Sequence, residues 1–152
     1  MIYLGIDPGA KGGYAWIDTE IKCNTATTMP YNEYEFVRSI ENIVYLSQAK
    51  NIRCCIEKVG AMPKQGVTSM FNFGMNFGIL KGVLLANHIS FQEISPRRWK
   101  KEFNLDNDKK KSIRICQELF PYVDLLPTER SRVPSDGMAE ALLIAEYARR
   151  TL

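Results

Sequence analysis

Four acidic residues stand where a folded chain could bring their side chains together. Asp7 follows an apolar run and precedes a Pro-Gly turn, and Glu57 lies near the end of a second β-prone run. Asp136 and Glu140 are four residues apart, so on a helix they lie about 40° apart around the axis. Crowded carboxylates repel one another, and divalent cations relieve that repulsion. Two Mg²⁺ or Mn²⁺ ions roughly 4 Å apart could then promote an in-line displacement at a phosphate.

Each acid also has a plain structural explanation. Asp7 could be an ordinary turn residue, and Glu57 could pair with Lys58 or lie at a strand edge. Asp136 could compensate a helix dipole, and Glu140 could be its solvated neighbour. The combination of all four, rather than any one of them, favours a metal site.

The other metal-binding residue types are scarce. His88 is the single histidine, and the four cysteines show no CxxC spacing. We therefore expect any metal to be held by oxygen, and we expect the cysteines to be buried free thiols in a reducing compartment.

The hydrophobic pattern predicts the elements that position these acids. A hairpin and a third antiparallel strand come first, and a helix with Asn32 as its N-cap then leads to a strand parallel to the first. Asp7 and Glu57 would then lie at the carboxyl ends of neighbouring strands, where open α/β sheets place their sites. The expected strands cover residues 2–6, 13–17, 22–29, 51–59 and 89–94, and the expected helices cover 32–48, 70–86, 112–119 and 135–149.

The length and composition are those of one globular domain, residues 1–152, with 45% hydrophobic and 24% charged residues. No apolar run approaches the ~20 residues needed to span a bilayer, and the N-terminus lacks a signal-peptide layout. We expect no membrane partner and a cytoplasmic location, in the host cytoplasm if the protein is phage-encoded.

Positive charge is concentrated in one window. Residues 97–114 contain eight basic and three acidic side chains, whereas the whole chain has a net charge of only +3. Such a window indicates a polyanionic partner, although a solvated lysine-rich helix face has the same composition. In the expected helix 70–86, Gly74, Gly78 and Gly82 form a smooth ridge, which we expect to pack closely on a neighbouring helix or sheet.

These segments resemble RuvC-type Holliday-junction resolvases, especially the compact phage and bacterial forms. The opening GIDPGAKGGYAWI resembles the first strand and hairpin of that family, and CIEKV resembles its second acidic strand. The segments MFNFGMNFGILKGVLLA, FQEISPRRWKK, KKKS and DGMAEALLIAEYARR follow in the family's order, so the resemblance covers nearly the whole chain.

The resemblance implies a ribonuclease H-like α/β fold, with a mixed five-stranded sheet of antiparallel hairpin strands and parallel strands flanked by helices. It implies a homodimer that cuts four-way (Holliday) DNA junctions with symmetric nicks, using Mg²⁺ or Mn²⁺, with two ions expected. By motif position, Asp7, Glu57, Asp136 and Glu140 would be catalytic metal ligands, and Lys111 would support the chemistry. The expected DNA-binding residues are Lys58, Lys64, Arg97, Arg98, Lys100, Lys101, Lys109, Lys110 and Lys111.

Two features depart from the family pattern. Bacterial members usually space the last two acids three apart, whereas here the spacing is four, and the family sometimes has histidine at the position of Asp136. Many members place an aromatic wedge three residues after the second acid, where this chain has Gly60; Met62, Met70 or Phe71 are possible substitutes. Three alternatives remain: a less selective fork or flap nuclease, a junction-binding protein without catalysis, and an actin-like kinase or ATPase.

Overall fold

The N-terminal sequence forms a three-stranded antiparallel unit. In the computed structural model, which describes residues 1–47, 51–61, 64 and 66–152, β1 (Ile2–Asp7) pairs with β2 (Gly13–Asp18), and β2 pairs with β3 (Cys23–Thr28). The hairpin and the third strand predicted from the sequence are confirmed.

Two crossover helices complete the sheet. α1 (Glu33–Leu46) begins after Asn32, whose side chain accepts a hydrogen bond from the Glu35 backbone N–H at 2.9 Å. The chain then forms β4 (Ile52–Glu57) parallel to β1, α2 (Val67–Ala86), and β5 (Ser90–Ile94) parallel to β4. The strand order is β3-β2-β1-β4-β5, which confirms the predicted ribonuclease H-like mixed five-stranded sheet.

Three further helices follow β5: α3 (Pro96–Glu102), α4 (Lys109–Leu119) and α5 (Asp136–Thr151). α5 agrees closely with its predicted range, and the Ser135 side chain caps it by accepting from the Met138 N–H at 3.2 Å. α3 was not predicted, because its run of charged residues hides the apolar spacing of so short a helix. α4 begins three residues earlier than expected, so it includes the lysine run.

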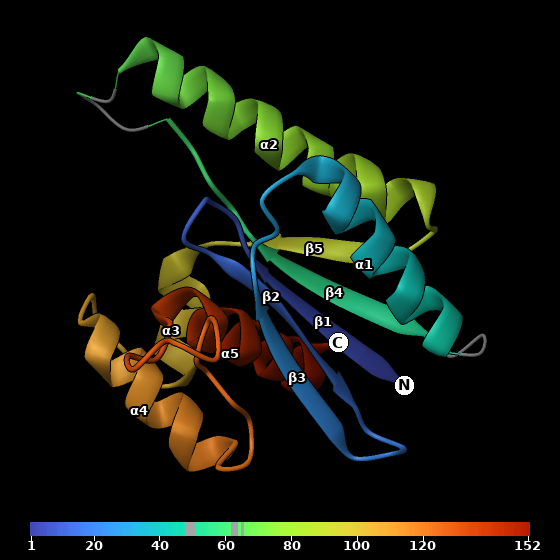
Figure 1. The fold of residues 1–152 in the computed structure, drawn as a ribbon, viewed down its shortest axis with the longest axis vertical. Coiled ribbons are helices and arrows are strands. Elements are labelled where there is room, and N and C mark those ends of the chain that lie inside the picture. The colour runs from blue at the N-terminus through green and yellow to red at the C-terminus, as the bar shows by residue number, and fades with distance from the viewer. Residues whose placement is uncertain (48–50, 62–63, 65) are drawn as a thin grey trace.

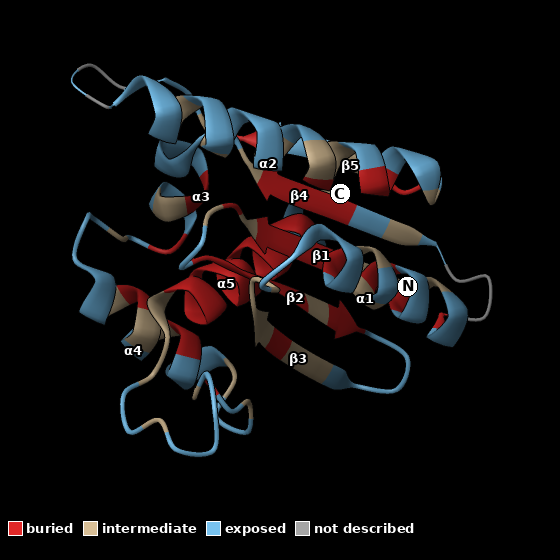
Figure 2. Cartoon of the chain, turned by 45° about the horizontal axis from the view of Figure 1, so that its top comes forward, coloured by how far each residue is buried: buried red, intermediate tan, exposed pale blue. Residues whose placement is uncertain are grey.

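The helices form two layers, one on each face of the sheet (Figure 1). α1 and α2 cover one face over a core that contains Leu4, Ile56 and Leu84. α3, α4 and α5 cover the other face over a second core, where Trp99 and Leu143 are completely buried. α5 is buried along most of its length, whereas α2 is largely exposed (Figure 2).

Glycine allows α5 to approach the sheet unusually closely. A Cβ at Gly5 on β1 would lie 2.2 Å from the backbone of Ala141 and Ala145, and a Cβ at Gly137 would lie 2.1 Å from the Lys11 carbonyl oxygen. Any side chain at these positions would push the helix away. The first turns of α5 therefore lie directly against the end of the β1–β2 hairpin.

Two expectations about packing are wrong. Cys54, Cys55 and Cys116 are buried free thiols as expected, but Cys23 is exposed because it lies on the edge strand β3. The glycine ridge of α2 does not pack closely on another described part of the chain: a Cβ at Gly74, Gly78 or Gly82 would have nothing within 4 Å.

Among helices in the described ranges, none is long and apolar enough to cross a membrane.

Candidate active site

Asp7 and Glu57 end two neighbouring parallel strands. Gly5 of β1 pairs with Cys55 of β4, so the residues two positions further on, Asp7 and Glu57, project from the same face of the sheet. That face is the one covered by α5, since Gly5 contacts the helix backbone. The sheet therefore directs both carboxylates toward the first turns of α5.

Asp136 and Glu140 on α5 complete a group that we name the carboxylate cluster: Asp7, Glu57, Asp136 and Glu140. Burial, followed by the charges of the other three acids, raises the pKa of Asp7 from 3.8 to about 8, and the nearby Lys109 opposes this effect. Among the described residues, none donates a hydrogen bond to the Asp7 carboxylate. The structure thus brings the four predicted acids together, with Asp7 at the centre of their repulsion.

Glu57 has one specific partner. The indole N–H of Trp99, a residue of α3, donates to Glu57 Oε2 at 2.6 Å. Burial raises the pKa of Glu57, the Trp99 hydrogen bond lowers it, and the charge of Glu140 raises it again. Sequence reasoning missed Trp99; the signal available was a tryptophan among basic residues directly after a predicted strand.

Asp136 and Glu140 have cationic and hydroxyl partners. Lys109 forms an ion pair with Asp136, and Lys100 Nζ lies 3.6 Å from Glu140 Oε1. The Ser112 hydroxyl, which is completely buried on α4, donates to Glu140 Oε1 at 3.1 Å. The sequence interpretation had treated Lys109 only as a DNA-binding residue and had not singled out Ser112.

The donor set suits Mg²⁺ or Mn²⁺, because it consists of carboxylate oxygens that repel one another when no cation is present. Within the described ranges, however, no three acidic, cysteine or histidine side chains are arranged as ligands of one ion. One oxygen of three of the acids is engaged within the protein: Lys109 binds Asp136 Oδ2, Trp99 donates to Glu57 Oε2, and Ser112 and Lys100 engage Glu140 Oε1. Asp136 Oδ2 becomes available to a metal when its ion pair with Lys109 opens.

The other predicted basic residues surround the cluster unevenly. Lys111 forms an ion pair with Asp106 and is not brought to the carboxylates. Arg97, Lys100 and Lys101 line a cavity of about 640 Å³ on α3 and the following loop. Arg98 lies over the Tyr147 ring, Lys110 is exposed at the start of α4, and Lys58 and Lys64 are exposed after β4.

No side chain replaces the aromatic wedge at its expected position. Gly60 is exposed, and a Cβ there would have nothing within 4 Å. Of the possible substitutes, Met62 lies outside the described residues, Met70 is half-buried, and Phe71 on α2 is 70% exposed.

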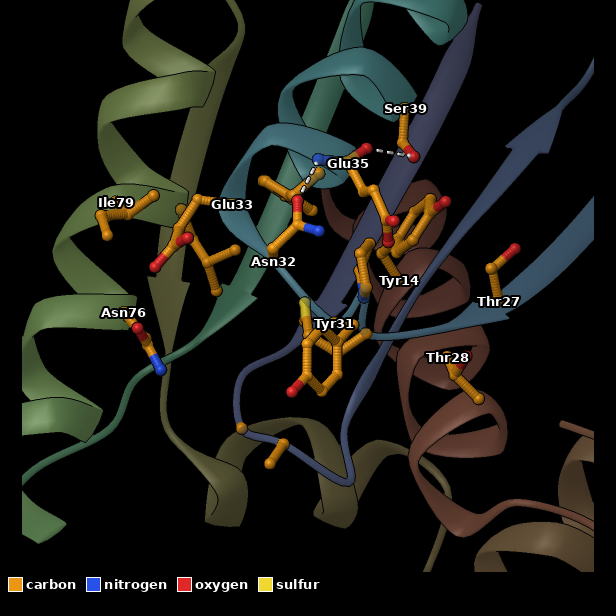
Figure 3. A pocket seen from close by; sticks show the side chains of 16 residues that line it. Tyr14, Thr27, Thr28, Tyr31, Asn32, Glu33, Glu35, Ser39, Asn76 and Ile79 are labelled. Atoms are coloured by element: carbon orange, nitrogen blue, oxygen red, sulfur yellow. Dashed lines mark hydrogen bonds between the residues drawn. The ribbon is translucent and has the colours of Figure 1, made fainter.

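A second hollow of about 680 Å³ lies on the opposite face, between α1, α2 and the hairpin turn. Tyr31 projects across it, and Asn32 and Ser39 are held to the Glu35 backbone (Figure 3). The described residues that line it include Glu33 and Glu35 and neither lysine nor arginine, so its charge does not suit a nucleic-acid backbone.

No protein-family model matches the sequence, and no curated protein sequence matches it. Solved structures do match. RuvC from Thermus thermophilus is 18% identical, with 99% of this chain and 96% of that chain covered and a TM-score of 0.58. The same protein in complex with a Holliday junction substrate is 17% identical over the same shares, with a TM-score of 0.61.

The chain has the RuvC fold. The yeast mitochondrial Holliday junction resolvase is also similar, at 17% identity, 97% of this chain and 77% of that chain, and a TM-score of 0.56. At these identities the likeness concerns the fold. Because the coverage extends over nearly the whole chain, the shared fold includes both the sheet and the α5 layer.

Proposed function

We propose that this protein is a metal-dependent endonuclease that resolves four-way DNA junctions as a homodimer. The observation that carries the proposal is the convergence of four carboxylates at the carboxyl ends of β1 and β4, beside the basic helices α3 and α4. The RuvC fold supports the choice of branched DNA as substrate.

Asp7, Glu57, Asp136 and Glu140 hold the metal ions in this proposal. When bound, Mg²⁺ or Mn²⁺ would stabilise the negative charge that develops as a phosphodiester is hydrolysed. A bound cation would favour the ionised form of Asp7, whose pKa burial and the neighbouring acids raise to about 8. Lys109 leaves Asp136 to bind a DNA phosphate, and Lys111 leaves Asp106 in the same way. The flanking DNA backbone is contacted by Arg97, Lys100 and Lys101.

The exposed face of α2 forms the dimer interface in this proposal. Val67 and Phe71 are 85% and 70% exposed, and the glycine ridge beside them has open space within 4 Å. Large apolar side chains along such a ridge suit a second helix at short range. A second copy would pair two carboxylate clusters, as symmetric nicking requires.

The dimer can be tested at Gly78, where an added Cβ would have no other described residue of its own chain within 4 Å. We expect Gly78→Gln to fold normally and to be monomeric by size-exclusion chromatography with light scattering. Asn72→Gln, an exposed substitution on the same helix, is the control and should remain dimeric. A wild-type monomer, or a dimeric Gly78→Gln protein, would contradict the α2 interface.

The nuclease activity is tested with labelled four-way junction, fork and linear duplex DNA, each with Mg²⁺, with Mn²⁺ and with EDTA. We expect paired nicks in the junction only when metal is present. Binding without cleavage in either metal would reduce the protein to a junction-binding module. The second candidate function is a general branched-DNA nuclease, because Gly60 provides no aromatic wedge to probe the junction centre. Equal cleavage of forks and four-way junctions would indicate that function.

A further inference from the structure

Trp99 is a large, mostly apolar side chain whose one polar atom is buried and hydrogen-bonded to an acid of the carboxylate cluster. The side chain is completely excluded from solvent within the core that joins β4, α3, α4 and α5. Its only polar atom, the indole nitrogen, donates to Glu57 Oε2 at 2.6 Å. A buried indole N–H needs an acceptor, and here the acceptor is a carboxylate of the cluster rather than a backbone carbonyl.

The chain directs Trp99 to Glu57 through the pairing of β4 with β5. Ile94, the last residue of β5, lies opposite Glu57, and the Lys58 N–H donates to the Ile94 carbonyl at 2.7 Å. Ser95 and Pro96 then start α3 at once, with proline at a helical position where it loses no hydrogen bond. One turn of helix brings Trp99 back under the end of β4.

We propose that Trp99 is a positioning residue for Glu57. Its indole N–H holds Oε2 and leaves Oε1 available to the metal ion, so the inference rests on the proposed metal-dependent function. Metal ligands are commonly oriented by a hydrogen bond to a neighbouring group. A rigid ring locked in a packed core can supply that orientation to a carboxylate as well as to a histidine.

The neutrality of the indole distinguishes Trp99 from the lysine partners of the cluster. Lys109 and Lys100 bring positive charge to Asp136 and Glu140, and a divalent cation would have to compete with that charge. The indole N–H has no net charge, so it restricts one oxygen of the Glu57 carboxylate without adding a cation that repels the metal. Trp99 therefore orients the Glu57 carboxylate as a metal ligand, whereas Lys109 competes with the metal for the Asp136 carboxylate.

The test removes the N–H and keeps the shape. The only other tryptophan is Trp16, which packs against Tyr14 in the core on the opposite face of the sheet. In a Trp16→Phe background, biosynthetic replacement of tryptophan by β-(3-benzothienyl)alanine changes Trp99 alone and puts sulfur where the N–H was. We expect Mn²⁺ affinity, measured from the EPR signal of free Mn²⁺, to fall by about 10–100-fold, the usual loss when such an orienting partner is removed.

The Trp16→Phe protein with natural tryptophan should bind Mn²⁺ like the wild type. Unchanged affinity after benzothienyl replacement would overturn the role of Trp99 and leave the nuclease proposal standing. Absence of Mn²⁺ binding in the wild type would overturn both. Circular dichroism should show both Trp16→Phe proteins fully folded at the temperature of the Mn²⁺ titration, which separates orientation from folding.

Nuclear magnetic resonance supplies a readout that a space-filling role would not affect. The two indole N–H signals of the ¹⁵N-labelled protein are assigned with Trp16→Phe. Mg²⁺ should shift the Trp99 signal much more than the Trp16 signal, because the hydrogen-bonded carboxylate changes its bonding. A Trp99 signal that remains unmoved while Mn²⁺ binding is measurable would contradict the proposal.

Discussion

Helix α5 carries two buried glutamates, and the two are held in opposite ways. Glu146, near the C-terminal end, is 3% exposed and accepts hydrogen bonds from Arg149 at 2.6 and 2.7 Å and from Arg150 at 2.9 Å. Burial alone would raise its pKa, but the two guanidinium groups outweigh burial and lower it. Its charge is balanced by residues of its own helix.

Glu140, near the N-terminal end, is 8% exposed and has no arginine partner among the described residues. The neutral Ser112 hydroxyl and Lys100, 3.6 Å away, are its partners, and three more acids lie nearby. Burial together with these neighbouring acids raises the pKa of Asp7 to about 8. The C-terminal end of α5 is thus internally paired, whereas the N-terminal end carries the repulsion and burial typical of a candidate binding site.

The largest expected difference between the two ends is catalytic. Asp7→Asn should lower junction cleavage by roughly 10³-fold or more, because it removes a central ligand worth several kcal/mol in the transition state. Glu146→Gln should keep the cleavage rate per folded molecule within about twofold, since Glu146 is paired with Arg149 and Arg150 near the C-terminal end of α5, away from the carboxylate cluster. Single-turnover cleavage of a labelled junction, normalised to folded protein, measures both.

Junction binding by Asp7→Asn, measured in Ca²⁺ or EDTA, should remain close to that of the wild type. Wild-type cleavage by Asp7→Asn would remove Asp7 from the ligand set. A loss of cleavage by Glu146→Gln equal to that of Asp7→Asn would show that the two ends of α5 are not functionally separate.

Metal binding should stabilise the native protein through the carboxylate cluster at the N-terminal end of α5, and not through Glu146. At a metal concentration of about 100 Kd, binding to the native state adds about 2.7 kcal/mol to the free energy of unfolding. We expect Mg²⁺ or Mn²⁺ to raise the Tm of the wild type and of Glu146→Gln, and EDTA to reverse the rise. Asp7→Asn should show almost no rise, and a full rise in that variant would place the metal elsewhere.

Most of the fold could be predicted from the sequence because its signals are local. The hairpin glycines, the Asn32 and Ser135 caps, and the strand and helix periodicities each lie within a few residues, and the order of elements then determines which strands are parallel. The grouping of the four acids also followed, since strand ends and helix faces are set by these local signals.

The partners of the acids could not be predicted in the same way. Trp99 reaches Glu57 across 42 residues of sequence, and Ser112 reaches Glu140 across 28. No periodic pattern encodes such a contact, because it depends on how α3 and α4 turn back under the sheet. Lysine runs were equally ambiguous: Lys109 and Lys111 are two residues apart, yet they pair with different acids.

Stability should depend on pH in opposite senses at the two ends. Asp7 binds its proton more tightly in the folded state, with a pKa of about 8 against 3.8, so its contribution becomes more destabilising as pH rises through that interval. In metal-free buffer, Asp7→Asn should therefore be more stable than the wild type by roughly 1–3 kcal/mol at pH 8 to 9, with the advantage shrinking toward pH 4.

Glu146 has a lowered pKa, so its stabilising contribution is complete above its ordinary value of 4.5 and is lost as pH falls below it. Glu146→Gln should be less stable than the wild type by roughly 1–3 kcal/mol at neutral pH, the range for hydrogen bonds to charged groups. Urea unfolding of all three proteins at several pH values tests both signs. An Asp7→Asn protein that is less stable than the wild type at pH 9 would contradict the repulsion.

The smallest expected effect concerns Lys109, which, like Lys100, gives the carboxylate cluster a partial substitute for the arginines of Glu146. Its ion pair with Asp136 is largely exposed, and such pairs contribute about 0–1 kcal/mol. Lys109→Gln should tighten Mn²⁺ binding by about two- to fivefold at pH 9, because the lysine no longer competes for Asp136, and should weaken junction binding.

The control is Lys110→Gln, which changes an exposed neighbour in the same lysine run and should leave Mn²⁺ affinity unchanged. If Lys109→Gln weakened Mn²⁺ binding, Lys109 would be a support for the metal site rather than a competitor, and the two ends of α5 would differ less than their contacts indicate.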